Sequence, residues 1–260
     1  MNPVIETILK RRSVRAYEEK PIEPEVREEL LCATLRAPTA GNLMLYSIVE
    51  VTDQHIKDTL AITCDNQPFI ARAPLVWLFL ADYQRWYDYF LASGVEQLCQ
   101  QKDTPMRKPQ EGDLLLACCD ALIAAQTAVI AAESLGLGSC YIGDIMENYE
   151  VHRKLFNLPK YVFPICLLCF GYPTLQQKQR QQTNRFREKF IRFDNQYHQI
   201  TAEEFEEMFH ETHAQTFRGL EELAGARNVG QLIYTRKFNA AFSIEMNRSV
   251  RAILNAWLED

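Results

Sequence analysis

The segment from Asp113 to Leu135 constrains the fold most, because it lacks proline and is apolar around almost its whole circumference. Asp120, Thr127 and Ser134 recur every seven residues and therefore share one narrow stripe of a helix. The remaining helix surface is mainly Leu, Ile, Val, Ala and Cys, which predicts a helix buried on nearly every side. Because its many alanines permit close helix contacts, it is either the central helix of a domain or a seam between subunits.

The rest of the chain predicts few strands and many helices. Apolar runs indicate strands at Tyr46–Thr52, Pro74–Ala81 and Tyr161–Phe170. Gly136 and Gly138 end the long helix, and a short strand or loop is expected to follow up to Gly143. Helical spacing, helix-opening prolines and a capping box predict the helices Pro3–Lys10, Pro24–Arg36, Gln54–Thr63, Asp82–Gln100, Tyr149–Phe156, Thr201–Phe217 and one from about Asn239.

No internal repeat or linker separates two cores in this mixed α/β chain. We therefore expect a single domain over residues 1–260, in which residues 200–260 form a helical C-terminal extension.

Charge and hydropathy exclude several classes of partner. The net charge is −6, and there is no basic face with interleaved aromatics, so we expect no nucleic-acid partner. The N-terminal residues MNPVIETILKRRS do not resemble a signal peptide, which favours a cytoplasmic location. The long helix carries Asp120, Gln126 and Glu133 and lacks an uninterrupted apolar span, so we expect no membrane partner.

The eight cysteines show no disulfide framework. Cys166 and Cys169 form a CxxC pattern within a predicted strand, where residues three apart face opposite sides and cannot chelate one metal. His210 and His213 lack the spacing of a zinc-protease motif. We therefore expect reduced cysteines and no metal site.

Four groups of residues could bind a ligand. Arg11, Arg12, Ser13 and Arg15 follow the first helix, and their guanidinium groups suit a phosphate, although a solvated basic patch would look the same. The similar run Asn247–Arg251 lies within an amphipathic helix, and we interpret it as structural.

The other three groups are weaker when each is considered alone. Pro38–Asn42 is a turn with short polar side chains and a glycine that lets a ligand approach the backbone. The glycines of Gly136–Gly143 would leave backbone N–H groups open beside a flat ligand. Arg185, which precedes Phe186, could add one more phosphate donor.

In this order, the four groups resemble the nitroreductase family of FMN-dependent oxidoreductases. The resemblance extends from Ile5 to about Tyr197 and rests on RRSVR, APTAGN leading into YSIVEV, AAESLGLGSCYIG, FPICLLCFGYP and RF. The C-terminal helical segment is similar to that of members with extended C-termini. The resemblance implies an α+β fold with a central mixed β-sheet surrounded by helices. It also implies an intertwined homodimer with two FMN molecules at the interface, each contacted by both subunits.

Residues are assigned to FMN by position in the family pattern. Five would hold the ribityl phosphate: Arg11, Arg12, Ser13, Arg15 and Arg185. Seven would contact the flavin ring: Pro38, Thr39, Asn42, Gln67, Tyr141, Ile142 and Gly143. Some of Pro38, Thr39 and Asn42 would do so from the second subunit. Thr183 stands where many members carry a basic residue, and Lys178, Arg180 and Arg187 are the candidates to replace it.

The resemblance further implies an NAD(P)H oxidoreductase that reduces nitroaromatics, quinones or flavins by ping-pong hydride transfer. The flavin N5 would carry the hydride, so no catalytic side chain is required. Tyr83 and Trp86, within a candidate lid from Tyr83 to Gly112, could stack on a small-molecule electron acceptor, or they could simply pack against the core. Two alternatives remain: other flavin chemistry, such as FMN fragmentation or dehalogenation, and a non-enzymatic flavin-binding role.

Overall fold

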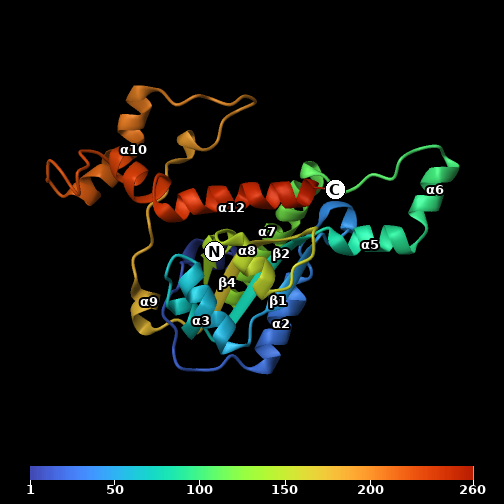
Figure 1. The fold of residues 1–260 in the computed structure, drawn as a ribbon. Helices are drawn as coiled ribbons and strands as arrows, with labels where there is room; N and C mark the ends of the chain where they lie inside the picture. The colour runs from blue at the N-terminus through green and yellow to red at the C-terminus, as the bar shows by residue number, and fades with distance from the viewer. Residues whose placement is uncertain (260) are drawn as a thin grey trace. The chain divides into compact units, whose positions relative to one another are not determined.

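The computed structural model describes residues 1–259 and centres on a sheet of four strands. They are β1 (Tyr46–Glu50), β2 (Leu75–Asp82), β3 (Gly138–Ile142) and β4 (Val162–Gly171), arranged in the order β1-β2-β4-β3 (Figure 1). All three strand pairings are antiparallel. Among the described residues, the parallel component of the expected mixed sheet is confined to an isolated bridge between Ser13 and Ser139.

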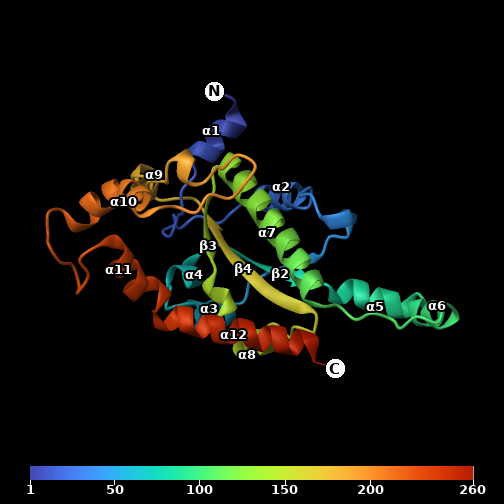
Figure 2. The ribbon, with the colours of Figure 1, turned by 90° about the horizontal axis from the view of Figure 1, so that it is seen from above.

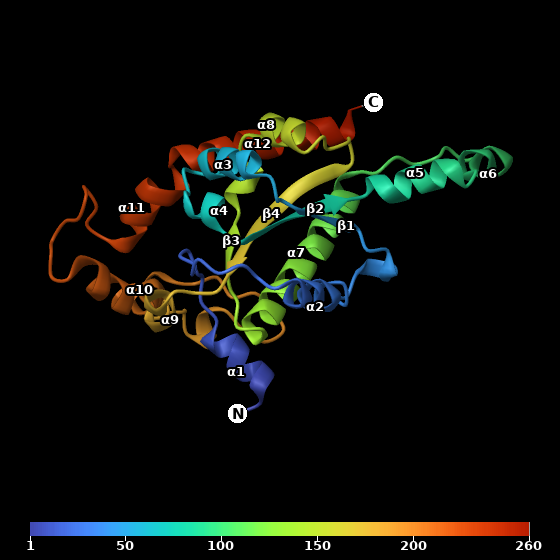
Figure 3. The same ribbon diagram turned by 90° about the horizontal axis from the view of Figure 1, so that it is seen from below.

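Helices cover both faces of this sheet (Figures 2 and 3). Helices α2 (Pro24–Thr34) and α7 (Glu111–Ser134) pack on one face, where their side chains meet those of β2 and β4. Helices α3 (Gln54–Thr63) and α4 (Phe69–Arg72) pack on the other. Every residue of β2 is consequently buried, which confirms the prediction of a strand covered on both faces.

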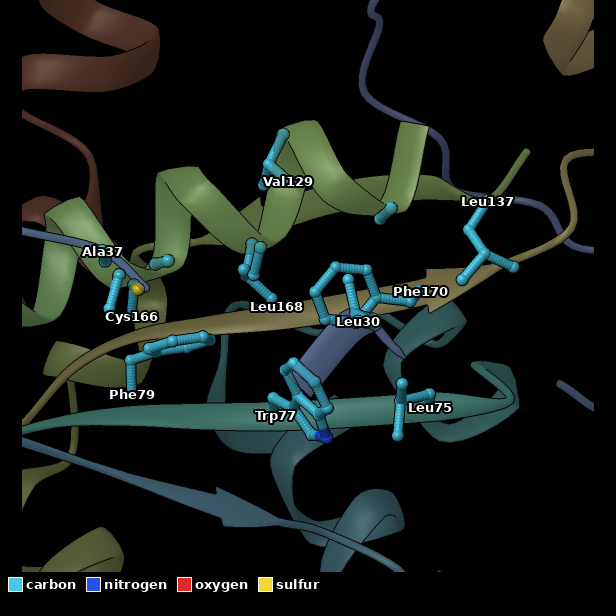
Figure 4. Close-up of a cluster of buried hydrophobic side chains, with 14 of the residues drawn as sticks. Leu30, Ala37, Leu75, Trp77, Phe79, Val129, Leu137, Cys166, Leu168 and Phe170 are labelled. Atoms are coloured by element: carbon cyan, nitrogen blue, oxygen red, sulfur yellow. The ribbon is translucent and has the colours of Figure 1, made fainter. Parts of the chain in front are cut away.

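The alternation of side chains along β2 and β4 divides the core into two layers. Trp77, Phe79 and Phe170 point towards α7, and Trp77 makes edge-to-face contacts with both phenylalanine rings (Figure 4). Cys166 lies in this layer, whereas Cys169 lies in the layer beneath α3. The prediction that these two thiols face opposite sides of one strand is confirmed.

Helix α7 has one buried face and one open face. Alanines at positions 117, 121, 124, 125, 128 and 132 are fully buried. The outer face of α7, formed by Leu115, Leu116, Leu122 and Ile123, is 40–67% exposed. The expectation of burial on nearly every side is therefore wrong for the single chain, because the alanines face the sheet whereas these three leucines and Ile123 point away from it. Although α7 is long and apolar enough to cross a membrane, it packs against β2 and β4 as a core helix does.

The remaining helices largely follow the predicted ranges. They are α1 (Pro3–Lys10), α5 (Gln84–Ala92), α6 (Val95–Gln101), α8 (Tyr149–Leu155), α9 (Leu175–Gln179), α10 (Ala202–Phe217), α11 (Val229–Ile233) and α12 (Ala241–Leu258). Short 3₁₀ turns lie at Ala40–Asn42, Asp144–Met146 and Glu188–Phe190, and a π-helical turn lies at Tyr234–Phe238. The capping box at Thr201 and Glu204 is confirmed.

The chain forms two compact units. The first comprises residues 1–180 and 245–259, and the second is Gln181–Ile244. Most of α12 thus belongs to the first unit, where Ser249 Oγ accepts a hydrogen bond from Tyr149 N at 3.1 Å. Arg248 forms ion pairs with Glu150 and Glu245, each at 2.8 Å, so the second RSVR run is structural as predicted. The expected helical extension is therefore divided between the two units.

Candidate functional site

The RRSVR segment leaves α1 and runs beside β3. Val14 N donates to Ser139 O at 2.8 Å, next to the Ser13–Ser139 bridge. This close approach requires a glycine at position 138, since a Cβ there would lie 2.5 Å from Val14 Cγ2. The sequence from Arg11 to Arg15 is consequently fixed in register against the start of β3.

This register gathers four guanidinium groups. Burial raises the pKa of the Cys140 thiol, and the nearby charges of Arg15, Arg180 and Arg11 oppose that shift. Burial likewise raises the pKa of Glu133 to about 7, against the lowering effect of Arg11 and Arg12. Arg12 Nη1 also donates to Arg180 O at 2.8 Å. Arg12 and Arg15 are tied by hydrogen bonds to the segment from Gln177 to Arg180, and these arginine charges act on the same two buried groups. We call Arg11, Arg12, Arg15 and Arg180 the arginine cluster.

Arg180 joins this cluster, whereas the predicted Arg185 lies in the second unit. There, Arg185 Nη1 donates to Thr183 Oγ1 at 2.7 Å. Lys178 and Arg180 are two of the three candidates to compensate for Thr183. Both lie in the first unit, and Arg12 donates to the backbone carbonyl oxygen of each. The phosphate role of Arg185 stays a prediction.

The turn after α2 is held by a buried carboxylate that sequence reasoning missed. Asp120 is 1% exposed, and its two oxygens accept hydrogen bonds from Ala40 N at 2.9 Å and Leu45 N at 3.1 Å. Gly41 and Asn42 adopt left-handed backbone conformations, with φ of 55° and 58°. The available signal was a single carboxylate in an otherwise apolar stretch of helix, which the seven-residue spacing placed on a polar stripe.

The aromatic residues proposed for substrate contact pack on this turn and on the core. Trp86 Nε1 donates to Leu43 O at 2.7 Å, and the Trp86 ring is partly buried. Tyr83 is 9% exposed and belongs to a cluster with Phe163 and Trp257. The packing alternative therefore describes Tyr83 well, while a substrate role for the more exposed Trp86 stays a prediction.

A second group of predicted residues meets at the far end of β3. Gln67 Nε2 donates to Cys64 O at 2.9 Å and to Asp144 Oδ2 at 2.8 Å, which leaves its carbonyl oxygen as an acceptor. Tyr141 is 37% exposed and Gly143 is exposed. Ile142 is 1% exposed, so its side chain belongs to the core and only its backbone could meet a ligand.

The Pro38–Asn42 turn is distant from the arginine cluster within one chain. The turn is tied to α7 at Asp120, whereas Arg11 and Arg12 lie near Glu133, thirteen residues further along the same helix. Thirteen residues of α-helix span about 20 Å. One chain therefore brings the arginines to β3 but holds the turn at the other end of α7.

The buried carboxyl group of Glu147 predicts a pH-dependent stability. Glu147 is 4% exposed, and burial raises its pKa to about 8, with a further contribution from Asp144. Because the folded-state pKa exceeds the unfolded value, stability from this group is present at low pH and is lost between about pH 4.5 and 8.

We expect Glu147→Gln to raise the Tm at pH 8.5 by roughly 2–4 °C, corresponding to about 1 kcal/mol, and to change it little at pH 5. Thermal unfolding followed by circular dichroism at both pH values would measure this effect. The exposed Glu96→Gln is the matched control, and an equal change in Tm at both pH values would contradict the prediction.

Comparison with known proteins identifies the chain. The model of the nitroreductase family matches residues 8–172. The chain belongs to the nitroreductase family. The match includes the RRSVR segment, the Pro38–Asn42 turn, Gln67 and the Tyr141–Gly143 strand end.

Similar proteins come from several bacteria. An oxygen-insensitive NADPH nitroreductase from Salmonella typhimurium is 33% identical over 173 residues, covering 66% of this chain and 67% of the relative. An FMN reductase (NADPH) from Bacillus subtilis is 32% identical over 175 residues, with the same coverage of 66% and 67%. A solved structure of a putative oxidoreductase from Bacteroides fragilis matches with a TM-score of 0.82 at 28% identity, covering 98% of this chain and 100% of that one. These matches confirm the predicted α+β nitroreductase fold.

Proposed function

We propose that this nitroreductase-family protein is an FMN-dependent NAD(P)H oxidoreductase that reduces nitroaromatics, quinones or flavins. The observation that carries the proposal is the arginine cluster beside β3, in a family whose similar members include an NADPH nitroreductase and an FMN reductase. A cytoplasmic location accompanies this proposal, and all eight cysteines are free thiols, as expected there.

The residues of the first unit fit FMN chemically. Arg11, Arg12 and Arg15 would bind its phosphate through charge-assisted hydrogen bonds, with Arg180 as an additional cation. The Gln67 carbonyl oxygen can accept a hydrogen bond from a polar ring edge, and Gly143 exposes its backbone without a side chain. Bound FMN would supply hydride transfer from NAD(P)H to the electron acceptor. The chain itself would orient the cofactor and limit access of water.

The first experiment is the visible spectrum of the purified protein with excess FMN removed. We expect a bound flavin that loses its colour under anaerobic conditions on addition of NADPH or NADH and regains it with a quinone or nitroaromatic. A protein that stays colourless after incubation with FMN would refute the cofactor assignment. A yellow protein that neither nucleotide reduces would refute the oxidoreductase function while leaving flavin binding intact.

We further propose that the protein is a homodimer assembled through the outer face of α7. Its leucine and isoleucine side chains form an exposed apolar face, which commonly marks an interface. The separation of about 20 Å between the Pro38–Asn42 turn and the arginine cluster also favours a shared site. In such a dimer, the turn of one subunit would complete the flavin site of the other.

Ile123→Glu is expected to convert the dimer into a monomer, because it places a charge on the outer face of α7 without touching the buried alanines. Light scattering after gel filtration should give twice 30.1 kDa for the wild type and 30.1 kDa for the variant. Ile62→Glu, at an exposed position of α3, is the matched control and should remain dimeric. A wild-type mass of one chain would exclude the homodimer.

A further inference from the structure

A positively charged cavity lies in the first unit, and of the described residues assigned to FMN only Arg15 is among those that line it. It has a volume of about 740 Å³ and lies between the Arg15–Ile22 segment, the start of β2 and helices α3 and α4. Its lining, as described for residues 1–259, includes Arg15. Within that range it does not include the other candidate FMN residues Arg11, Arg12, Gln67 and Gly143. We call it the Lys57 cavity, after the buried lysine in its wall.

The charge of its lining contrasts with that of the whole chain. Five cations line the Lys57 cavity, namely Arg15, Lys20, Arg27, Lys57 and Arg72, against two carboxylates, Glu18 and Glu19. The lining thus carries a formal charge of +3, whereas the chain carries −6. An acidic protein that concentrates positive charge in a cavity will attract anions there.

Some of these charges are already neutralised. Arg27 forms an ion pair with Glu50, Lys20 lies 3.3 Å from Glu23, and Glu18 lies 3.2 Å from Lys178. Within residues 1–259, no ion pair neutralises Arg15, Lys57 or Arg72. Arg15 is also assigned to FMN, so Lys57 and Arg72 are the cations that remain for the cavity when the cofactor is bound. Against the single remaining carboxylate, Glu19, they leave a net positive charge that favours an anionic ligand.

Lys57 is the most unusual member of this set. It is 8% exposed, and Nζ donates to Ala73 O at 2.9 Å, which uses one of its three N–H donors. Lysine is rarely so deeply buried unless it is paired. Burial lowers the pKa of Lys57, so an anion entering the cavity would stabilise its charged form.

Arg72 supplies a second open donor set. Its side chain has no hydrogen-bond or ion-pair partner among residues 1–259, although it lies at the end of α4 on the cavity wall. Arginine presents a planar fork that matches phosphate oxygens. The remaining wall includes the apolar side chains of Ile22, Phe69 and Pro74, which could pack against an organic group.

We propose that the Lys57 cavity binds an organic phosphate, with the phosphate held by Lys57 and Arg72 and the organic part packed on the apolar wall. This site is additional to the FMN site and does not depend on the proposed oxidoreductase function. Arg15 is the residue that the two sites share, since it also belongs to the arginine cluster.

Calorimetric titration of the protein with phenyl phosphate, in the presence of saturating FMN, tests the proposal. We expect one binding site per chain in the wild type. The affinity should be at least about tenfold lower in Arg72→Ala, because that variant loses one charge-assisted hydrogen bond to the phosphate. Arg251→Ala removes an exposed arginine of α12 that does not line the cavity, and it should bind as the wild type does.

Two further comparisons make the result decisive. Lys57→Met should also weaken binding of phenyl phosphate. Arg72→Ala is the primary variant because Arg72 is exposed, so its replacement should preserve the fold, whereas Lys57 is buried. Benzoate should bind much more weakly than phenyl phosphate. Absence of binding at millimolar phenyl phosphate, equal affinity in Arg72→Ala and the wild type, or equal affinity for benzoate would overturn the proposal.

Discussion

Replacement of Asp120 by alanine is expected to lower the free energy of unfolding by about 2–4 kcal/mol, because it leaves two N–H groups without their acceptor. These are the backbone N–H groups of Ala40 and Leu45, which Asp120 binds from the buried side of α7. Urea denaturation would measure the loss. Asp120→Asn keeps one acceptor oxygen, so its effect should be intermediate.

The same substitution should weaken FMN binding if the Pro38–Asn42 turn contacts the flavin. Glu111→Ala provides the control, since it removes an exposed carboxylate from the first turn of the same helix. An Asp120→Ala protein with wild-type stability would show that the two hydrogen bonds contribute nothing. Wild-type FMN affinity in a destabilised variant would instead separate the turn from the cofactor site.

Gly138→Ala is expected to cost about 1–3 kcal/mol and to weaken FMN binding by tenfold or more, because a Cβ at this position overlaps Val14. Relief of that overlap must move the backbone from Arg11 to Arg15 away from β3. The arginine cluster would then lose the register that brings its guanidinium groups together. Chemical denaturation and fluorescence titration with FMN would measure the two effects.

Gly112→Ala is the matched control for this prediction. Nothing lies within 4 Å of a Cβ at Gly112, which is within α7, so alanine should be neutral or slightly stabilising there. If Gly138→Ala retained wild-type FMN affinity, the position of RRSVR on β3 would not determine cofactor binding.

The regular elements were predictable because each has a strong local signal. The unbroken apolar run of β2 predicted a strand covered on both faces, and the spacing of Cys166 and Cys169 predicted their opposite orientations. Thr201 and Glu204 predicted the start of α10. Such signals depend on neighbours within a few residues, which the sequence displays directly.

Features that depend on distant contacts were less accessible. The sequence could not tell that Leu115, Leu116 and Leu122 would lie exposed while the alanines of α7 met the sheet, because both residue types are apolar. The partners of Asp120 lie 80 and 75 residues away in the chain. Helix α9 is capped by Thr174, but its five residues are too few to produce a hydrophobic pattern.

The candidate site shows the same division. The RRSVR segment was recognisable as a candidate phosphate site, but which later arginine lies beside it depended on where the chain runs after β4. Burial of Tyr83 depended on a hydrophobic cluster that also includes Trp257, far along the chain. Residue type therefore indicated the chemistry, and tertiary contacts decided which side chains could perform it.

One face of α7 packs in the core of the chain, and its other face is the one that we propose for dimer assembly. Substitutions among its alanines disturb the chain's own core, whereas substitutions among its outer leucines leave that core untouched. In the proposed homodimer, selection could therefore tune subunit affinity without altering the stability of the individual chain. If the proposed interface is correct, a few exchanges on one face of a single helix could change the oligomeric partner of such a protein.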